Sequence, residues 1–145
     1  MNLRQPLLLV SLSLISILAF GQTDTIAKKK YQVHRGAGYA QAVLVDNVLY
    51  ISGTVASGDM AAQLKGAYTG IERTLKAYGA TFQNVVKENL YTTDIEAVKS
   101  NNEIRKAFYK GDYPAATWVQ ISRLFMQQAL VEVEVIAHLP ANKTK

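Results

Sequence analysis

The sequence predicts a single α+β domain in which two helices cover one face of a mixed β-sheet, in the order ββαβαββ. Three observations lead to this prediction. Two short apolar runs flank a two-residue polar turn, one long segment carries apolar residues at helical spacing, and the last strand alternates valine with glutamate. The chain has 145 residues, which suffices for one hydrophobic core and is too short for two.

The first half of the domain is predicted to be a β-hairpin followed by a long helix. The runs AVLV (42–45) and VLYIS (48–52) are joined by Asp46-Asn47, a two-residue hairpin turn. Asp59 is the expected N-cap of a helix over about 60–78, and Gly79 is its expected C-terminal stop. The apolar stripe of this helix consists of Leu64, Ala67, Tyr68, Ile71, Leu75 and Tyr78.

The second half is predicted to continue with a strand over 84–94 and one helix over 95–109, capped by Asp94. Ala97, Ile104, Ala107 and Phe108 are expected to face inward from this helix. Two strands, 117–122 and 130–139, complete the sheet.

The alternation in the last strand predicts two different faces. Val131, Val133 and Val135 are expected to pack under the helices, which turns Glu132 and Glu134 to the opposite face. Such a half-polar open face is often covered by another subunit, and simple solvation of both glutamates explains the same pattern.

The first 21 residues are predicted to be a cleavable secretory signal peptide. A positive charge at Arg4 precedes a charge-free apolar run, and Ala19-Phe20-Gly21 offers small residues for cleavage near Gly21/Gln22. The run is shorter than the roughly 20 residues of a membrane-spanning helix. We therefore expect a periplasmic or secreted protein without a stable membrane anchor after cleavage. Its parts are then 1–21 signal, 22–35 leader, 36–139 domain and 140–145 polar tail.

Composition excludes several classes of function. The chain has no cysteine, so disulfides, thiol nucleophiles and thiolate metal sites are absent. Its two histidines lie far apart in the sequence without partner ligands, and we predict no metal. The net charge is +5, but the basic residues are scattered, so nucleic acid is not an expected partner. No phosphate-binding loop or G-x-S-x-G elbow is present, and no cofactor is predicted.

Six motifs in order over residues 36–139 resemble the RidA/YjgF family of enamine/imine deaminases. They are GAGYAQAV (36–43), LYISGTV (49–55), AAQ (61–63), VKENLYTTD (86–94), AFYKGDYPAATWVQISRL (107–124) and VEVEVIA (131–137). The resemblance implies a chorismate mutase-like fold and a homotrimer whose sheets line a central barrel. It also implies a small-molecule pocket at each subunit interface, where imines are hydrolysed by water without a metal or cofactor.

The resemblance also implies the residues of the pocket, and one of them departs from the family. The family's key arginine lies in a Pro-Ala-Arg motif, where its planar fork holds the substrate carboxylate through two charge-assisted hydrogen bonds. Here the motif reads Pro114-Ala115-Ala116, so Ala116 takes the arginine position. The implied pocket consists of Tyr39, Ser52, Gly53, Asn102, Ala116, Thr117, Trp118 and Glu132. Glu132 is the candidate catalytic residue, as the group that positions or activates water.

No arginine nearby in sequence replaces the missing one. Arg123 has the opposite strand parity to residue 116 and lies roughly 23 Å from it along a continuous strand. Arg35 or Arg105 from a neighbouring subunit stays open as a replacement.

These observations support three hypotheses about function. The first is an exported homotrimer that binds a small molecule and has little or no standard 2-imino acid deaminase activity, because Ala116 replaces the arginine. The alternative is an enamine/imine deaminase, a hydrolase, that acts on a non-standard substrate through Glu132 and Tyr39. A purely protective or protein-interaction role without a pocket ligand is the third.

Overall fold

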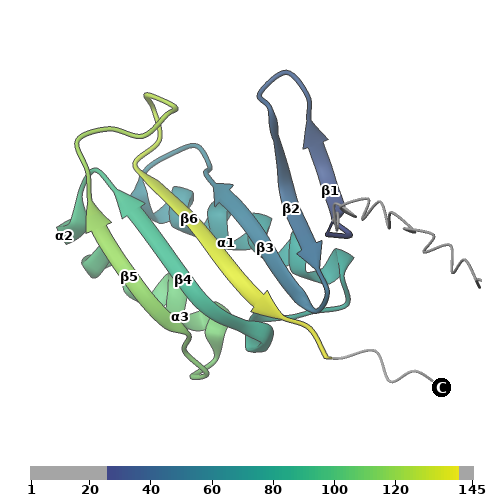
Figure 1. Ribbon diagram of the computed structural model, residues 1–145. Coiled ribbons are helices and arrows are strands. Elements are labelled where there is room, and N and C mark those ends of the chain that lie inside the picture. Colours follow the sequence, from purple (N-terminus) through teal and green to yellow (C-terminus); the bar gives the residue numbers. More distant parts are fainter. Residues whose placement is uncertain (1–25, 141–145) are drawn as a thin grey trace, which may run out of the picture.

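Six strands form one mixed sheet in the order β1-β2-β3-β6-β4-β5 (Figure 1). A computed structural model describes residues 26–140, so the predicted signal peptide lies outside the described residues. The elements are β1 (Lys29–His34), β2 (Tyr39–Val45), β3 (Val48–Thr54), α1 (Met60–Ala77), the 3₁₀ helix η1 (Phe82–Asn84), β4 (Val85–Thr92), α2 (Ile95–Ser100), α3 (Asn102–Tyr109), β5 (Ala115–Gln120) and β6 (Val131–His138). Only β4 and β5 pair in parallel; the other neighbouring strands are antiparallel. The predicted fold class is confirmed.

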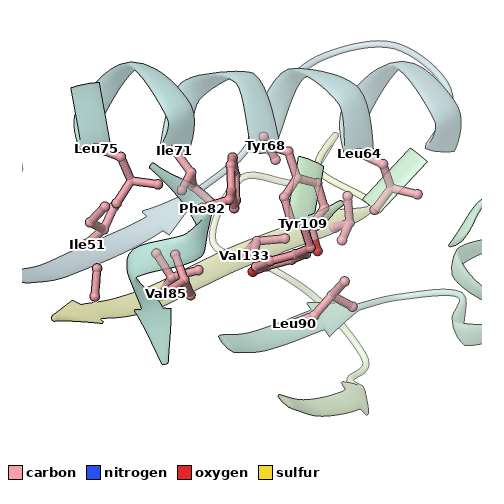
Figure 2. Packing of buried hydrophobic residues seen from close by; sticks show 14 of the residues in the cluster. Ile51, Leu64, Tyr68, Ile71, Leu75, Phe82, Val85, Leu90, Tyr109 and Val133 are labelled. Carbon is pink, nitrogen blue, oxygen red and sulfur yellow. The ribbon is translucent and has the colours of Figure 1, made fainter. Parts of the chain in front are cut away.

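The hydrophobic core lies between the sheet and the helices on one of its faces. Figure 2 shows side chains of α1, Leu64 and Ile71 among them, directed toward Val133 of β6. All three valines of β6 that were predicted to face inward are buried, and Glu132 and Glu134 of the same strand are partly exposed on the other face. Burying a side chain of this size contributes about 1.5–3 kcal/mol, so the alternating pattern fixes which face of β6 carries the helices.

The ends of α1 are set by the residues that the sequence indicated. The Asp59 side chain accepts a hydrogen bond from the Ala62 amide at 2.8 Å, as an N-cap does. At the other end Gly79 takes a φ of +67°, and the Ala80 amide donates back to the Leu75 carbonyl. This left-handed turn closes the helix at low cost because glycine has no Cβ.

An additional strand, β1, lies in the segment predicted as a polar leader. The sequence KKYQVH is basic and almost wholly exposed, so it carries no buried face that an alternation pattern would reveal. Its backbone pairs with β2, and Tyr31 packs edge-on against Tyr78 of α1 with ring centroids 5.9 Å apart. Lysines on an edge strand oppose further strand pairing.

The helix predicted over 95–109 is two helices, because the chain breaks at Asn101. The Asn101 side chain donates to the Ala97 carbonyl at 2.9 Å, and its ψ of 12° ends α2 before α3 begins. Asparagine favours such breaks because its amide competes with the backbone for hydrogen bonds. The restart turns Arg105 inward, whereas Ala107, predicted to face the core, is exposed. No helix within residues 26–140 is long and apolar enough to cross a membrane.

Candidate functional site

Four of the predicted pocket residues line one hollow of about 570 Å³. Tyr39 opens β2, Ser52 and Gly53 lie in β3, and Glu132 lies in β6. The loop before β6 adds Phe125, whose side chain is 92% exposed. The full lining is Gly36, Ala37, Tyr39, Ser52, Gly53, Val55, Phe125, Met126 and Glu132. It combines one carboxylate and one phenol with apolar walls, as small-molecule sites do.

A β-bulge in β3 positions Glu132 in this hollow. Ile51 pairs with Val135 and Thr54 pairs with Val133, so that both Ser52 and Gly53 lie opposite a single residue of β6. A Cβ on Gly53 would overlap the Glu132 carboxylate, so any other residue here would displace that side chain from its position. The Ser52 hydroxyl donates to the Ala40 carbonyl at 2.8 Å and ties β2 to the bulge.

The two glutamates of β6 differ in what they bind. Glu134 accepts hydrogen bonds from the Asn89 amide at 2.8 Å and from the Tyr91 hydroxyl at 3.1 Å. No group in the described part of the chain donates a hydrogen bond to the Glu132 side chain. Burial, and secondly the Glu134 charge, raise the pKa of Glu132 above its usual range. Glu132 is therefore the carboxylate that is free to accept a proton or hold a water molecule.

Tyr39 stands at the mouth of the hollow with its ring stacked on His34. The ring centroids are 4.7 Å apart and the planes differ by 22°. The side chain is 43% exposed, so the hydroxyl is accessible to a ligand.

The other four predicted pocket residues do not line this hollow. Asn102 begins α3, and Ala116, Thr117 and Trp118 lie on β5, the edge strand at the far side of β4. The row through Glu132 meets β5 at Val119, two strands away. Ala116 is three residues further along and on the opposite face, so at least roughly 14 Å of sheet separates the two groups. Within one chain the predicted pocket residues therefore form two separate groups, one at the hollow and one on β5 and α3.

A buried cluster around Glu88 of β4 lies next to the predicted residues on β5, where Trp118 bonds to Glu88. Glu88 is fully buried and accepts four hydrogen bonds, two at each carboxylate oxygen. The Arg105 Nε donates to Oε1 at 2.8 Å and the Trp118 indole donates to Oε1 at 2.9 Å. The hydroxyls of Tyr68 and Tyr109 donate to Oε2 at 3.0 and 2.6 Å. A carboxylate that is paired and bonded this completely is tolerated in a core.

Glu88 is a buried polar residue that was not predicted from the sequence, and neither was its bonding to Tyr68, Arg105, Tyr109 and Trp118. Glu88 has the same strand parity as Leu90 and Thr92, which both face the core. That parity is a signal for a buried carboxylate, and it predicts a cationic partner from a covering helix. Arg105 is that partner. Burial in the same cluster raises the pKa of Tyr68 and of Tyr109.

Aromatic rings enclose the Arg105 guanidinium. Its central carbon lies 4.7 Å from the Tyr109 ring, 4.9 Å from the Trp118 ring and 5.7 Å from the Tyr113 ring. Burial lowers the pKa of Arg105, but the charge and hydrogen bond of Glu88, together with Tyr68 and Tyr109, outweigh this effect and raise the pKa, so the guanidinium is charged. One helical turn earlier, the Oδ1 atom of Asn102 is buried without a hydrogen-bond partner among residues 26–140.

The sequence and the fold agree with one known family. The family model described as Endoribonuclease L-PSP, the YjgF/UK114 group, matches residues 31–139. The chain belongs to this family. Within it the chain is 36% identical over 108 residues to the human 2-iminobutanoate/2-iminopropanoate deaminase, which covers 68% of this chain and 78% of the human protein. It is 31% identical over 118 residues to the RutC family protein UK114 of Drosophila melanogaster, covering 75% and 85%.

Solved structures of YjgF family members share the architecture. A member of the YjgF/YER057c/UK114 family from Mycobacterium tuberculosis superposes with a TM-score of 0.72 at 29% identity, over 78% of this chain and all of that one. A YjgF family protein from Neisseria meningitidis has the same TM-score at 22% identity, over 79% and 97%, which supports the fold alone.

Proposed function

We propose that this YjgF family protein binds a small organic molecule in a pocket made by copies of itself, in a homotrimer. The observation that supports the proposal is the division of the site: Glu132 and Tyr39 line a hollow, whereas Ala116 and Trp118 lie on an exposed edge strand. A second copy whose β5 meets the hollow would join the two halves. The exposed Phe125 beside the hollow is the kind of side chain that such a contact buries.

We further propose that this pocket has little or no standard 2-imino acid deaminase activity. Ala116 gives the edge strand no cation at the position where the family resemblance implies an arginine. A charge-assisted hydrogen bond contributes about 1.5–3 kcal/mol, so losing the arginine fork weakens binding of a carboxylate substrate by tenfold or more.

Imine hydrolysis of a non-standard substrate is the second candidate, and Glu132 favours it. In that reaction Glu132 takes a proton from water as the water oxygen adds to the imine carbon. That proton passes to the imine nitrogen and gives a carbinolamine. The hydroxyl proton of the carbinolamine is then transferred to the same nitrogen, the C–N bond breaks, ammonia leaves and the carbonyl forms. The raised pKa of Glu132 suits such proton transfer, and Tyr39 is placed to contact the adduct. The hollow has no basic side chain among its lining residues, which argues against RNA as its substrate.

The test is hydrolysis of 2-iminopropionate by the purified protein, beside Ala116→Arg and beside an arginine-bearing relative as a reference. We expect the wild type to be at least tenfold slower than the relative. Wild-type turnover as fast as the relative's contradicts the first proposal. Activity that Glu132→Gln abolishes without loss of folded protein supports the hydrolase, whereas activity that survives Glu132→Gln contradicts the proposed role of Glu132.

Assembly and export have separate measurements. Light scattering coupled to size-exclusion chromatography should give the mass of a trimer, and a monomer would contradict the shared pocket. We also propose that the protein is exported and that its signal peptide is removed near Gly21. N-terminal sequencing of the protein from cells tests the cleavage site directly.

A further inference from the structure

The part of the proposed pocket around Ala116 lies close to a cation from a helix, the Arg105 guanidinium of α3. Ala116 lies directly across from Glu88 in the parallel β4–β5 pairing, on the helix-covered side of the sheet. Glu88 binds Arg105 of α3, and Trp118, two residues after Ala116, donates to the same Glu88 oxygen. The guanidinium stands 4.9 Å from the Trp118 ring and 5.7 Å from the Tyr113 ring. Register and these contacts place it beside Ala116.

The bonds of Arg105 leave part of its fork unused. Its Nε donates to Glu88, and neither terminal nitrogen donates to any group within residues 26–140. Neither terminal nitrogen is among the fully buried atoms that lack a partner, so both keep contact with the surface. The rings of Tyr109 and Trp118 pack against the guanidinium, and 7% of the side chain remains exposed. The Nε bond to Glu88 leaves the edge formed by the two terminal nitrogens without a partner among residues 26–140. An edge with two parallel N–H groups is the part that binds carboxylates.

The neighbours of Arg105 hold this edge in one orientation. The Glu88 bond and the aromatic rings fix a side chain that otherwise samples many rotamers, so less entropy is lost when a ligand binds. Asn102, one turn earlier on α3, adds a buried amide oxygen without a partner. A cationic fork beside an unused acceptor suits a ligand that carries both a carboxylate and an N–H group.

We propose that Arg105 is the anion-binding residue of this site, and that the ligand is a small organic carboxylate longer than 2-iminopropionate. This rests on the proposed pocket and names its ligand class. The side chain of Ala116 ends at a methyl group and the guanidinium comes from α3 behind the strand, so a carboxylate must reach past β5 to meet it. The wall at Ala116 thus has a recessed charge. Glu88 acts as a positioning residue.

The experiment is a titration followed through the indole N–H signal of Trp118, the single tryptophan, which is bonded to Glu88. The probes are straight-chain carboxylates from propionate to hexanoate and the matching primary amides. The variants are Arg105→Lys, which keeps the charge but loses the fork, and Glu88→Gln with Arg105→Gln, which removes both buried charges together. Arg73→Gln, an exposed arginine on α1, is the matched control for net charge.

We expect wild type and Arg73→Gln to bind the longer carboxylates at least tenfold more tightly than their amides. Arg105→Lys should bind them at least tenfold more weakly, and the double variant should lose the preference for carboxylates. Equal binding of carboxylates and amides by wild type overturns the inference but leaves the pocket proposal standing. An undiminished preference for carboxylates over amides in Arg105→Lys also overturns the inference and leaves the pocket proposal standing. This variant keeps the buried charge and is therefore expected to fold. Binding of neither probe class overturns the pocket, and the inference with it.

Discussion

Replacing Glu88 or Arg105 alone should destabilise the protein far more than replacing both. Glu88 is fully buried and the Arg105 side chain is 7% exposed, so either single change leaves an unpaired charge in the core. We expect Glu88→Gln and Arg105→Gln each to cost about 3–5 kcal/mol. Because domains of this size have unfolding free energies of about 5–15 kcal/mol, both variants should be marginally folded.

The double variant should recover much of this loss. Glutamine at position 88 can accept from the Trp118 indole through its oxygen and donate to the hydroxyl oxygens of Tyr68 and Tyr109 through its nitrogen. No buried charge remains, and we expect a total cost of about 1–3 kcal/mol for the lost charge-assisted bonds. A double-mutant cycle of Glu88 and Arg105 should therefore give a coupling energy of at least about 3 kcal/mol.

Urea unfolding followed by Trp118 fluorescence measures the cycle, with every variant at one protein concentration because assembly adds to apparent stability. The indole donates to Glu88, so the probe reports the cluster itself. The reasoning would be refuted if the losses in unfolding free energy of the two single variants summed to that of the double variant within about 0.5 kcal/mol.

Four further predictions concern the bulge, the open face and one helix end. Gly53→Ala should push the Glu132 carboxylate out of the hollow at a cost of about 1–3 kcal/mol, and carbon-13 titration of the carboxyl should show its pKa falling toward the usual range. Glu134→Gln should also lower the pKa of Glu132, since a like charge is removed, and an unchanged pKa in the same titration contradicts this. In the wild type, Glu132's contribution to stability should decline as pH rises from the ordinary glutamate value through the raised pKa, because the folded chain binds its proton more tightly. Lys110→Gly should raise the free energy of unfolding by about 1 kcal/mol, because Lys110 has a φ of +52° at the end of α3. Urea unfolding should show this as a higher midpoint concentration, and a lower midpoint would count against this account.

The parts of the fold that local chemistry determines could be predicted from the sequence. The capping aspartate at 59, the glycine at 79 and the valine alternation in β6 each act through neighbours in the chain or a strict period of two. Strand β1 could not be found in this way, because its order comes from backbone pairing with β2 and its side chains are mostly exposed.

The structure brings together only part of the predicted pocket. The resemblance supplied Tyr39, Ser52 and Glu132, which the structure brings to one hollow. The preference for Glu132 over Glu134 as the free carboxylate has its physical basis in cross-strand partners on β4, which depend on register. The Glu88–Arg105 pair joins residues from a strand and a helix that sequence periodicity treats separately.

The position of β6 has a consequence for how the chain folds. This last strand lies in the middle of the sheet, between β3 and β4, and makes the pairing that joins the two halves. During synthesis β3 emerges roughly 80 residues ahead of β6, which at typical elongation rates is about 4–16 s. Until then neither half has a complete sheet, and any truncation before residue 131 removes the central strand. The sheet of this domain is therefore completed only after β6 has been made, and a product shortened before residue 131 lacks the strand that joins its two halves.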